Sequence, residues 1–68
     1  MKTNEEIVSK IREMMEYELK SIARLDKAQM FWENQGYRET AEDMKNSSRT
    51  HLRCYTALKI LLEFADAD

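Results

Sequence analysis

The fold of this chain is decided by the stretch FWENQGYR, residues 31–38, which contains the one strong turn signal. Gly36 is the only glycine and proline is absent. A glycine suits the left-handed position just past the end of a helix. On both sides of it, apolar residues recur three and four apart, which is typical of helices. We therefore expect a single all-α domain over 1–68, with helices over about 4–34 and about 37–65 and a turn over 34–37.

The first helix carries a regular apolar seam. Its start is marked by Thr3 and Glu6, which have the spacing of a capping box. The seam residues alternate between steps of three and four: Val8, Ile11, Met15, Glu18, Ile22, Leu25, Gln29 and Trp32. We expect this seam to be widened by Ile7, Met14, Leu19 and Ala28.

The second half of the chain repeats the same spacing. Its seam consists of Tyr37, Ala41, Met44, Ser48, His51, Tyr55, Leu58, Leu62 and Ala65. Two such helices joined at one glycine predict an antiparallel hairpin. The segment 46–48, Asn-Ser-Ser, has poor helix propensity, so a break near Ser48 that gives three helices is the alternative. The seam keeps its phase through this segment, which favours a continuous helix.

Two helices cannot cover all the apolar residues of this sequence. A chain of 68 residues has a small core, and its one cysteine excludes an internal disulfide. The second helix is apolar nearly all round toward its end, which indicates burial on more than one side. We expect a homodimer packed as a four-helix bundle, or a higher oligomer, with an interface at Leu52, Ile60, Leu61 and Phe64. This arrangement resembles, in architecture, the plasmid copy-number regulators of the Rop type.

Three polar residues occupy seam positions: Glu18, Ser48 and His51. In a hairpin that turns at Gly36, Glu18 lies at about the height of His51, with Ser48 one turn away. A carboxylate and an imidazole can bind a metal, but bundle metal sites need more carboxylates than one hairpin supplies. We therefore predict a buried polar layer that fixes register, with no metal and no cofactor.

Catalytic and membrane functions find no support in the residues. There is no glycine-rich phosphate loop and no nucleophile with a nearby base, so we expect that the protein is not an enzyme. No apolar run approaches the ~20 residues that span a bilayer. Acidic residues stand near the start, where a signal peptide would be apolar, and the lone cysteine fits a reducing compartment. We expect a cytoplasmic protein without membrane contact.

The charge distribution is the main functional hint. The net charge is −2, so the chain lacks the overall basic character of DNA-binding domains. Six cations nevertheless gather in two segments, 20–27 and 45–53, that a hairpin places at one height. Together with Tyr17, they form a candidate anion-binding belt: Lys20, Arg24, Lys27, Lys45, Arg49 and Arg53.

These observations predict a function in binding rather than catalysis. The first hypothesis is a small regulatory or adaptor protein that acts as a homo-oligomeric bundle on a macromolecular partner, most simply another protein. The alternative is that the basic belt sequesters a nucleotide or other phosphate-bearing ligand, or binds RNA. Such an activity would suit a small phage-type accessory or anti-defence factor.

Overall fold

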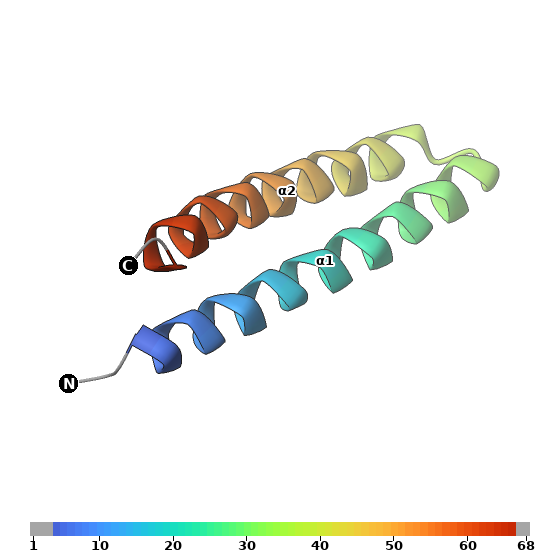
Figure 1. Ribbon diagram of the computed structural model, residues 1–68. Coiled ribbons are helices and arrows are strands. Elements are labelled where there is room, and N and C mark those ends of the chain that lie inside the picture. The colour runs from blue at the N-terminus through green and yellow to red at the C-terminus, as the bar shows by residue number, and fades with distance from the viewer. Residues whose placement is uncertain (1–3, 67–68) are drawn as a thin grey trace.

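The computed structural model describes residues 4–66, which form two helices and, within that range, no strand (Figure 1). Helix α1 spans Asn4–Asn34 and helix α2 spans Arg38–Asp66. Helix α2 runs without interruption through residues 46–48, so the three-helix alternative is wrong. Thr3 of the predicted capping box lies outside the described residues.

The turn is a Schellman motif built on Gly36. This glycine has a φ of 87°, in the left-handed region that only glycine enters without strain. Its N–H donates to the Glu33 carbonyl at 3.0 Å, and the Tyr37 N–H donates to the Trp32 carbonyl at 2.9 Å. The rings of Trp32 and Tyr37 meet edge to face with centroids 5.5 Å apart, which closes the motif with an apolar contact. The Tyr37 carbonyl then accepts the first hydrogen bond of α2 from Ala41.

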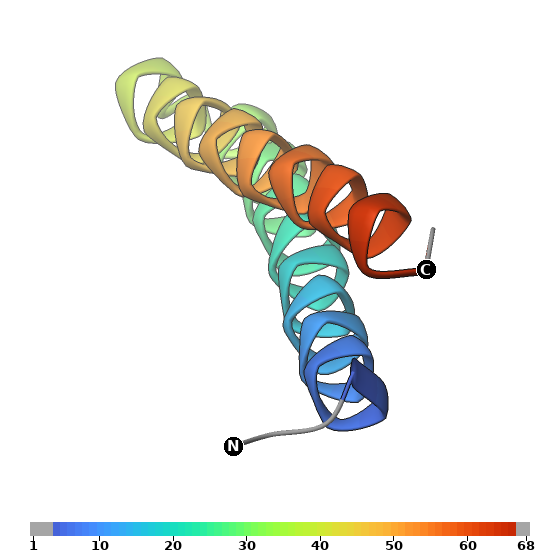
Figure 2. The same cartoon turned by 60° about the vertical axis from the view of Figure 1, so that its left-hand side comes forward.

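The helices run antiparallel and pack side by side over a molecule of 50 × 16 × 14 Å (Figure 1). Figure 2 shows that they are inclined to one another rather than strictly parallel. All eight predicted seam residues of α1 are at least partly buried, and so are those of α2 from Ala41 to Ala65. Tyr37 is exposed, as are Ile7, Met14 and Leu19, so the prediction that they belong to or widen the seam is wrong for this hairpin.

The core of the hairpin is thin. Its buried hydrophobic residues are Ile11, Ala41 and Leu58, and no large side chain is completely buried. The accessible surface is 5664 Å². A compact monomer of this mass exposes only about 4,500 Å². The radius of gyration is 15.6 Å, against about 11 Å for a compact chain of this length. The hairpin therefore leaves a large surface for other contacts.

Candidate functional site

A polar contact joins the helices near the middle of the seam. The ring Nδ1 of His51 lies in hydrogen-bonding contact with Oε2 of Glu18, as the sequence predicts. The Glu18 side chain is 15% exposed and that of His51 is 31% exposed. Ser48 does not join this pair, because its Oγ donates to Oδ1 of Asp26 at 3.0 Å instead. The three residues of the predicted buried polar layer thus take part in two separate interhelical hydrogen bonds, of which the one between Ser48 and Asp26 is exposed.

Sequence reasoning missed Ser21, the most deeply buried polar residue among those described. Its exposed fraction is 4%. The Oγ donates to the Tyr17 carbonyl at 3.0 Å and accepts from Arg24 at 3.4 Å, so the hydroxyl is satisfied within its own helix. Its position in the repeat gives no signal of burial, because Ile7 and Met14 of the same helical column are exposed.

The described residues do not converge on a chemical centre. Within residues 4–66, no group of three or more His, Cys, Asp or Glu side chains is placed to hold a metal ion. Cys54 is exposed, and the carboxylate beside the one histidine belongs to Glu18. This pair joins the two helices, and the hydroxyl of Ser21, which lines the same hollow as His51, donates to the Tyr17 carbonyl.

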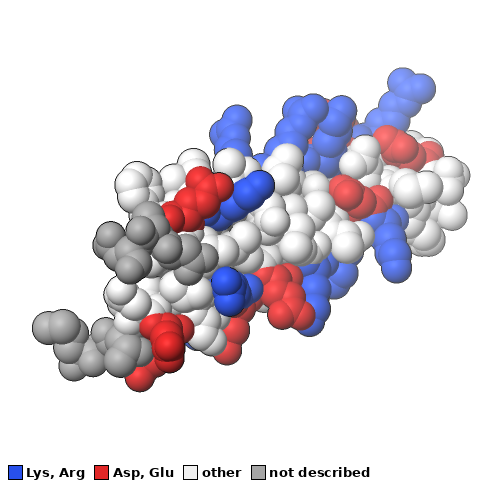
Figure 3. All heavy atoms as spheres, viewed as in Figure 1, with Lys and Arg blue, Asp and Glu red and all other residues white. Residues whose placement is uncertain are grey.

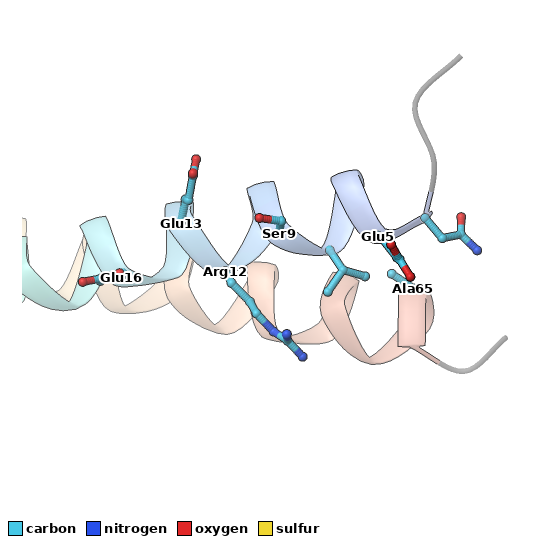
Figure 4. Close-up of a pocket in the computed structure, with 8 residues that line it drawn as sticks. Glu5, Ser9, Arg12, Glu13, Glu16 and Ala65 are labelled. Carbon is cyan, nitrogen blue, oxygen red and sulfur yellow. The ribbon is translucent and has the colours of Figure 1, made fainter.

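A groove of about 590 Å³ lies at the open end of the hairpin, between the start of α1 and the end of α2. Glu5, Arg12, Glu13 and Glu16 contribute charged side chains to it. Figure 4 shows Arg12 extending across α2, whereas Glu13 points away from it. Because its charged side chains are all exposed and diverge, the groove lacks the convergent polar groups of a small-molecule site.

The two sides of the hairpin differ in chemistry. On one flank of the seam, each helix has a further series of residues spaced three and four apart. In an antiparallel pair, the series of α1 and the series of α2 lie on the same side of the hairpin. A hollow of about 350 Å³ accordingly brings Tyr17, Ser21 and Ala28 of α1 beside His51 of α2. We call this side the weakly charged face; it consists of Ile7, Lys10, Met14, Tyr17, Ser21, Arg24, Ala28 and Phe31 of α1 and Thr40, Asp43, Ser47, Thr50, Cys54, Ala57, Leu61 and Phe64 of α2.

The opposite side, beyond the other flank of the seam, is the charged face. It consists of Ser9, Arg12, Glu16, Leu19, Ala23, Asp26, Met30 and Glu33 of α1 and Arg38, Glu42, Lys45, Arg49, Leu52, Thr56, Lys59 and Glu63 of α2. Ten of these sixteen residues are charged, against three of the sixteen on the weakly charged face. The hydrogen bond between Asp26 and Ser48 lies on this side of the seam.

The six cations of the predicted belt share a height but do not form one cluster. Figure 3 shows Lys and Arg along both long edges of the hairpin, over α2 and over α1. Lys20 and Lys27 lie on the outer edge of α1, where Glu16 pairs with Lys20 at 3.2 Å. Arg24 lies on the weakly charged face.

The cations of α2 form a ridge of their own. Lys45 and Arg49 lie on the charged face, and Arg53 lies on the outer edge of α2. These three residues follow one another at intervals of four, and none has an ion-pair partner within residues 4–66. The helix therefore carries three uncompensated positive charges over little more than two turns.

The four predicted interface residues are all exposed, but they lie on different sides. Leu61 and Phe64 belong to the weakly charged face. Leu52 lies on the charged face at the height of Leu19, and Ile60 lies on the outer edge of α2. The four predicted residues thus lie on three different surfaces. A partner that packs on the weakly charged face would cover only Leu61 and Phe64.

Protein-family models, curated proteins and solved structures provide no match to this chain. Within residues 4–66, neither helix combines the length and the apolar character needed to cross a bilayer. The features that remain to suggest a function are the thin core, the two unlike faces and the basic ridge of α2.

Proposed function

We propose that this chain is a small non-enzymatic regulatory or adaptor protein that assembles into a homo-oligomeric helical bundle and binds a macromolecular partner. The observation that supports this most is the imbalance between exposed and buried apolar residues. Eleven large hydrophobic side chains are exposed in the single hairpin, whereas the buried hydrophobic residues number three. Six of the eleven lie on the weakly charged face, and exposed apolar patches mark interaction sites.

The accessible surface area of the hairpin also supports self-association. The hairpin exposes 5664 Å², about 1,200 Å² more than a compact monomer of its mass. A standard stable interface buries about 800 Å² on each partner. One interface with a second copy would therefore remove most of the excess.

The basic ridge of α2 suits the macromolecular partner. Like charges four residues apart on a helix repel one another by a few tenths of a kcal/mol. Lys45, Arg49 and Arg53 keep this repulsion because no acidic side chain of the described chain pairs with them. An acidic surface on a partner protein would relieve it and would add charge complementarity to the contact.

Native mass spectrometry combined with light scattering tests the assembly. We expect an integral multiple of the 8.1 kDa subunit mass at micromolar concentration. A monomer at every concentration up to the millimolar range would contradict the proposal. The same spectrum reports any small molecule retained from the expression host.

A second candidate function is the binding of a phosphate-bearing ligand or RNA, and the unpaired cations of α2 favour it. The test uses pyrophosphate in calorimetry and a single-stranded RNA oligonucleotide in fluorescence anisotropy, both at physiological salt. Binding by the wild type that is lost in Lys45→Glu/Arg49→Glu, and kept in the matched Lys20→Glu/Lys27→Glu control, would establish it. Absence of binding to both probes would exclude it and leave the protein partner.

A further inference from the structure

We propose that the weakly charged face is the surface on which a second copy of this chain packs, face to face, with both turns at the same end of the bundle. This inference rests on the proposed self-association and adds which face is used and how the copies are oriented. Four features of the hairpin carry it: the spacing, the charge, the area and the distribution of large side chains along the face.

The first feature is the spacing of the residues on this face. A helix in a four-helix bundle packs against two neighbours and therefore needs two seams. In α1 the second seam runs from Ile7 to Phe31, and in α2 it runs from Thr40 to Phe64, both with unbroken steps of three and four. The first seam of each helix is already occupied inside the hairpin. The second seams lie together on one side, where Ser21 is covered within its own hairpin and most of the other residues are exposed.

The second feature is the low charge. Burying an unpaired charge is expensive, so a face that packs on another chain carries few of them. The weakly charged face has three charged residues, Lys10, Arg24 and Asp43. Ten charged residues make the opposite face far more costly to bury. The difference selects one side of the hairpin for the second copy and leaves the other to solvent or to a different partner.

The third feature is the apolar area. Six large side chains on this face are more than two-fifths exposed: Ile7, Met14, Tyr17, Phe31, Leu61 and Phe64. Phe64, at 74%, is the most exposed large hydrophobic residue described. A second copy would cover each of these six residues twice, once on each chain, because a twofold interface uses the same patch on both copies.

The fourth feature gives the orientation. Five of these six side chains lie in the half of the hairpin nearer its open end, whereas Phe31 lies near the turn, where α2 places Thr40, Asp43, Ser47 and Thr50. When both turns lie at one end, α1 of each copy faces α2 of the other at equal height. Phe64 then lies at the height of Ile7 of the second copy, and Leu61 lies at the height of Lys10, between Ile7 and Met14.

The opposite orientation gives poorer contacts. With the turns at opposite ends, α2 faces α2 and α1 faces α1. With the symmetry axis midway along the hairpin, Phe64 then lies opposite Thr40 of the second copy and Leu61 lies opposite Asp43. Phe31 and Ile7 are the one pair of large apolar side chains that meet. In the same-end arrangement, Arg24 and Asp43 of the two copies instead lie within one helical turn of each other and have opposite charge.

Distance measurement by pulsed electron paramagnetic resonance tests the orientation. The variant carries Cys54→Ala, to remove the native thiol, and Gln35→Cys, to attach one spin label at the turn. Same-end packing gives a distance between labels of about 10–25 Å, since neighbouring helix axes are about 8–10 Å apart. Opposite-end packing gives a distance near the 50 Å length of the hairpin and would overturn the orientation while leaving self-association intact. Absence of any dipolar coupling, with a monomer mass, would overturn self-association itself.

Aspartate substitutions test the face. Leu61 and Ile60 are neighbours with similar exposure, 54% and 50%, but only Leu61 lies on the weakly charged face. We expect Leu61→Asp to raise the dimer dissociation constant by about a hundredfold or more. Ile60→Asp and Leu52→Asp, both outside this face, should change it by less than about threefold. Dissociation by Ile60→Asp or Leu52→Asp with no effect of Leu61→Asp would overturn the assignment. If Leu61→Asp unfolds, the label distance in the otherwise native chain still decides the question.

Discussion

At the scale of single residues, Gly36 carries the conformational requirement of the turn. No atom lies within 4 Å of the place that a Cβ would take, so a side chain there meets only the cost of the left-handed backbone. We expect Gly36→Ala to lower the free energy of unfolding by about 1–2 kcal/mol. Urea unfolding at fixed protein concentration measures this, with Gly36→Asn as the control that loses less because asparagine tolerates this conformation. Equal losses for the two variants would contradict this explanation.

The Glu18–His51 contact gives a second prediction at the same scale. Removing one partner leaves the other polar and partly buried, so Glu18→Leu alone and His51→Leu alone should each destabilise the chain by about 1–2 kcal/mol. The double variant should recover most of this loss, because two leucines fill the seam without an unpaired polar group. A double-mutant cycle by thermal or urea unfolding gives the coupling. Losses that simply add would show that the two side chains do not depend on each other.

At the scale of the elements, the continuity of α2 can be tested at Asn46. This residue is exposed in the middle of the helix, beside two serines of low helix propensity. Asn46→Pro removes a helical N–H and clashes with the preceding turn, so it should cost ~3 kcal/mol. Asn46→Ala should stabilise the helix by about 0.5 kcal/mol. Circular dichroism during thermal unfolding follows both changes; a proline variant as stable as the wild type would mean that the helix breaks there.

The two helices could be predicted from the sequence because the signals for them come from residues that are close together in the chain. The ends of α1 follow from the start of the seam and from Gly36, and the seam residues of both helices repeat too regularly to fit another element. The unbroken phase through residues 46–48 outweighed the poor propensity of that segment. These features depend on near neighbours in the sequence, which is where helix physics acts.

The sides of the helices were harder to predict. Ile7, Met14 and Leu19 are apolar but exposed, because the packing of α1 on α2 covers only one stripe of each helix. The apolar character of a residue predicts burial but does not identify the surface that buries it. Ser21 is buried although Ile7 and Met14 of the same helical column are exposed, so its burial does not follow from the seven-residue repeat. The cations of the predicted basic belt share a height but lie on different sides for a related reason. Residue numbers give the height of a cation along the hairpin, whereas its side depends on its place in the seven-residue repeat.

At the scale of the whole molecule, a thin core and a bare face imply that folding and assembly are coupled. If two chains of 68 residues unfold together, the unfolding enthalpy is about 95 kcal/mol at ~0.7 kcal/mol per residue. Mass action then raises the Tm by about 5 °C for each tenfold increase in protein concentration. Calorimetry over two decades of concentration measures this slope. Leu61→Asp should flatten it and Ile60→Asp should preserve it, because only Leu61 lies on the weakly charged face. A wild-type Tm that does not move with concentration would mean that the hairpin is stable alone, and its exposed apolar side chains would then have to serve a partner other than a second copy.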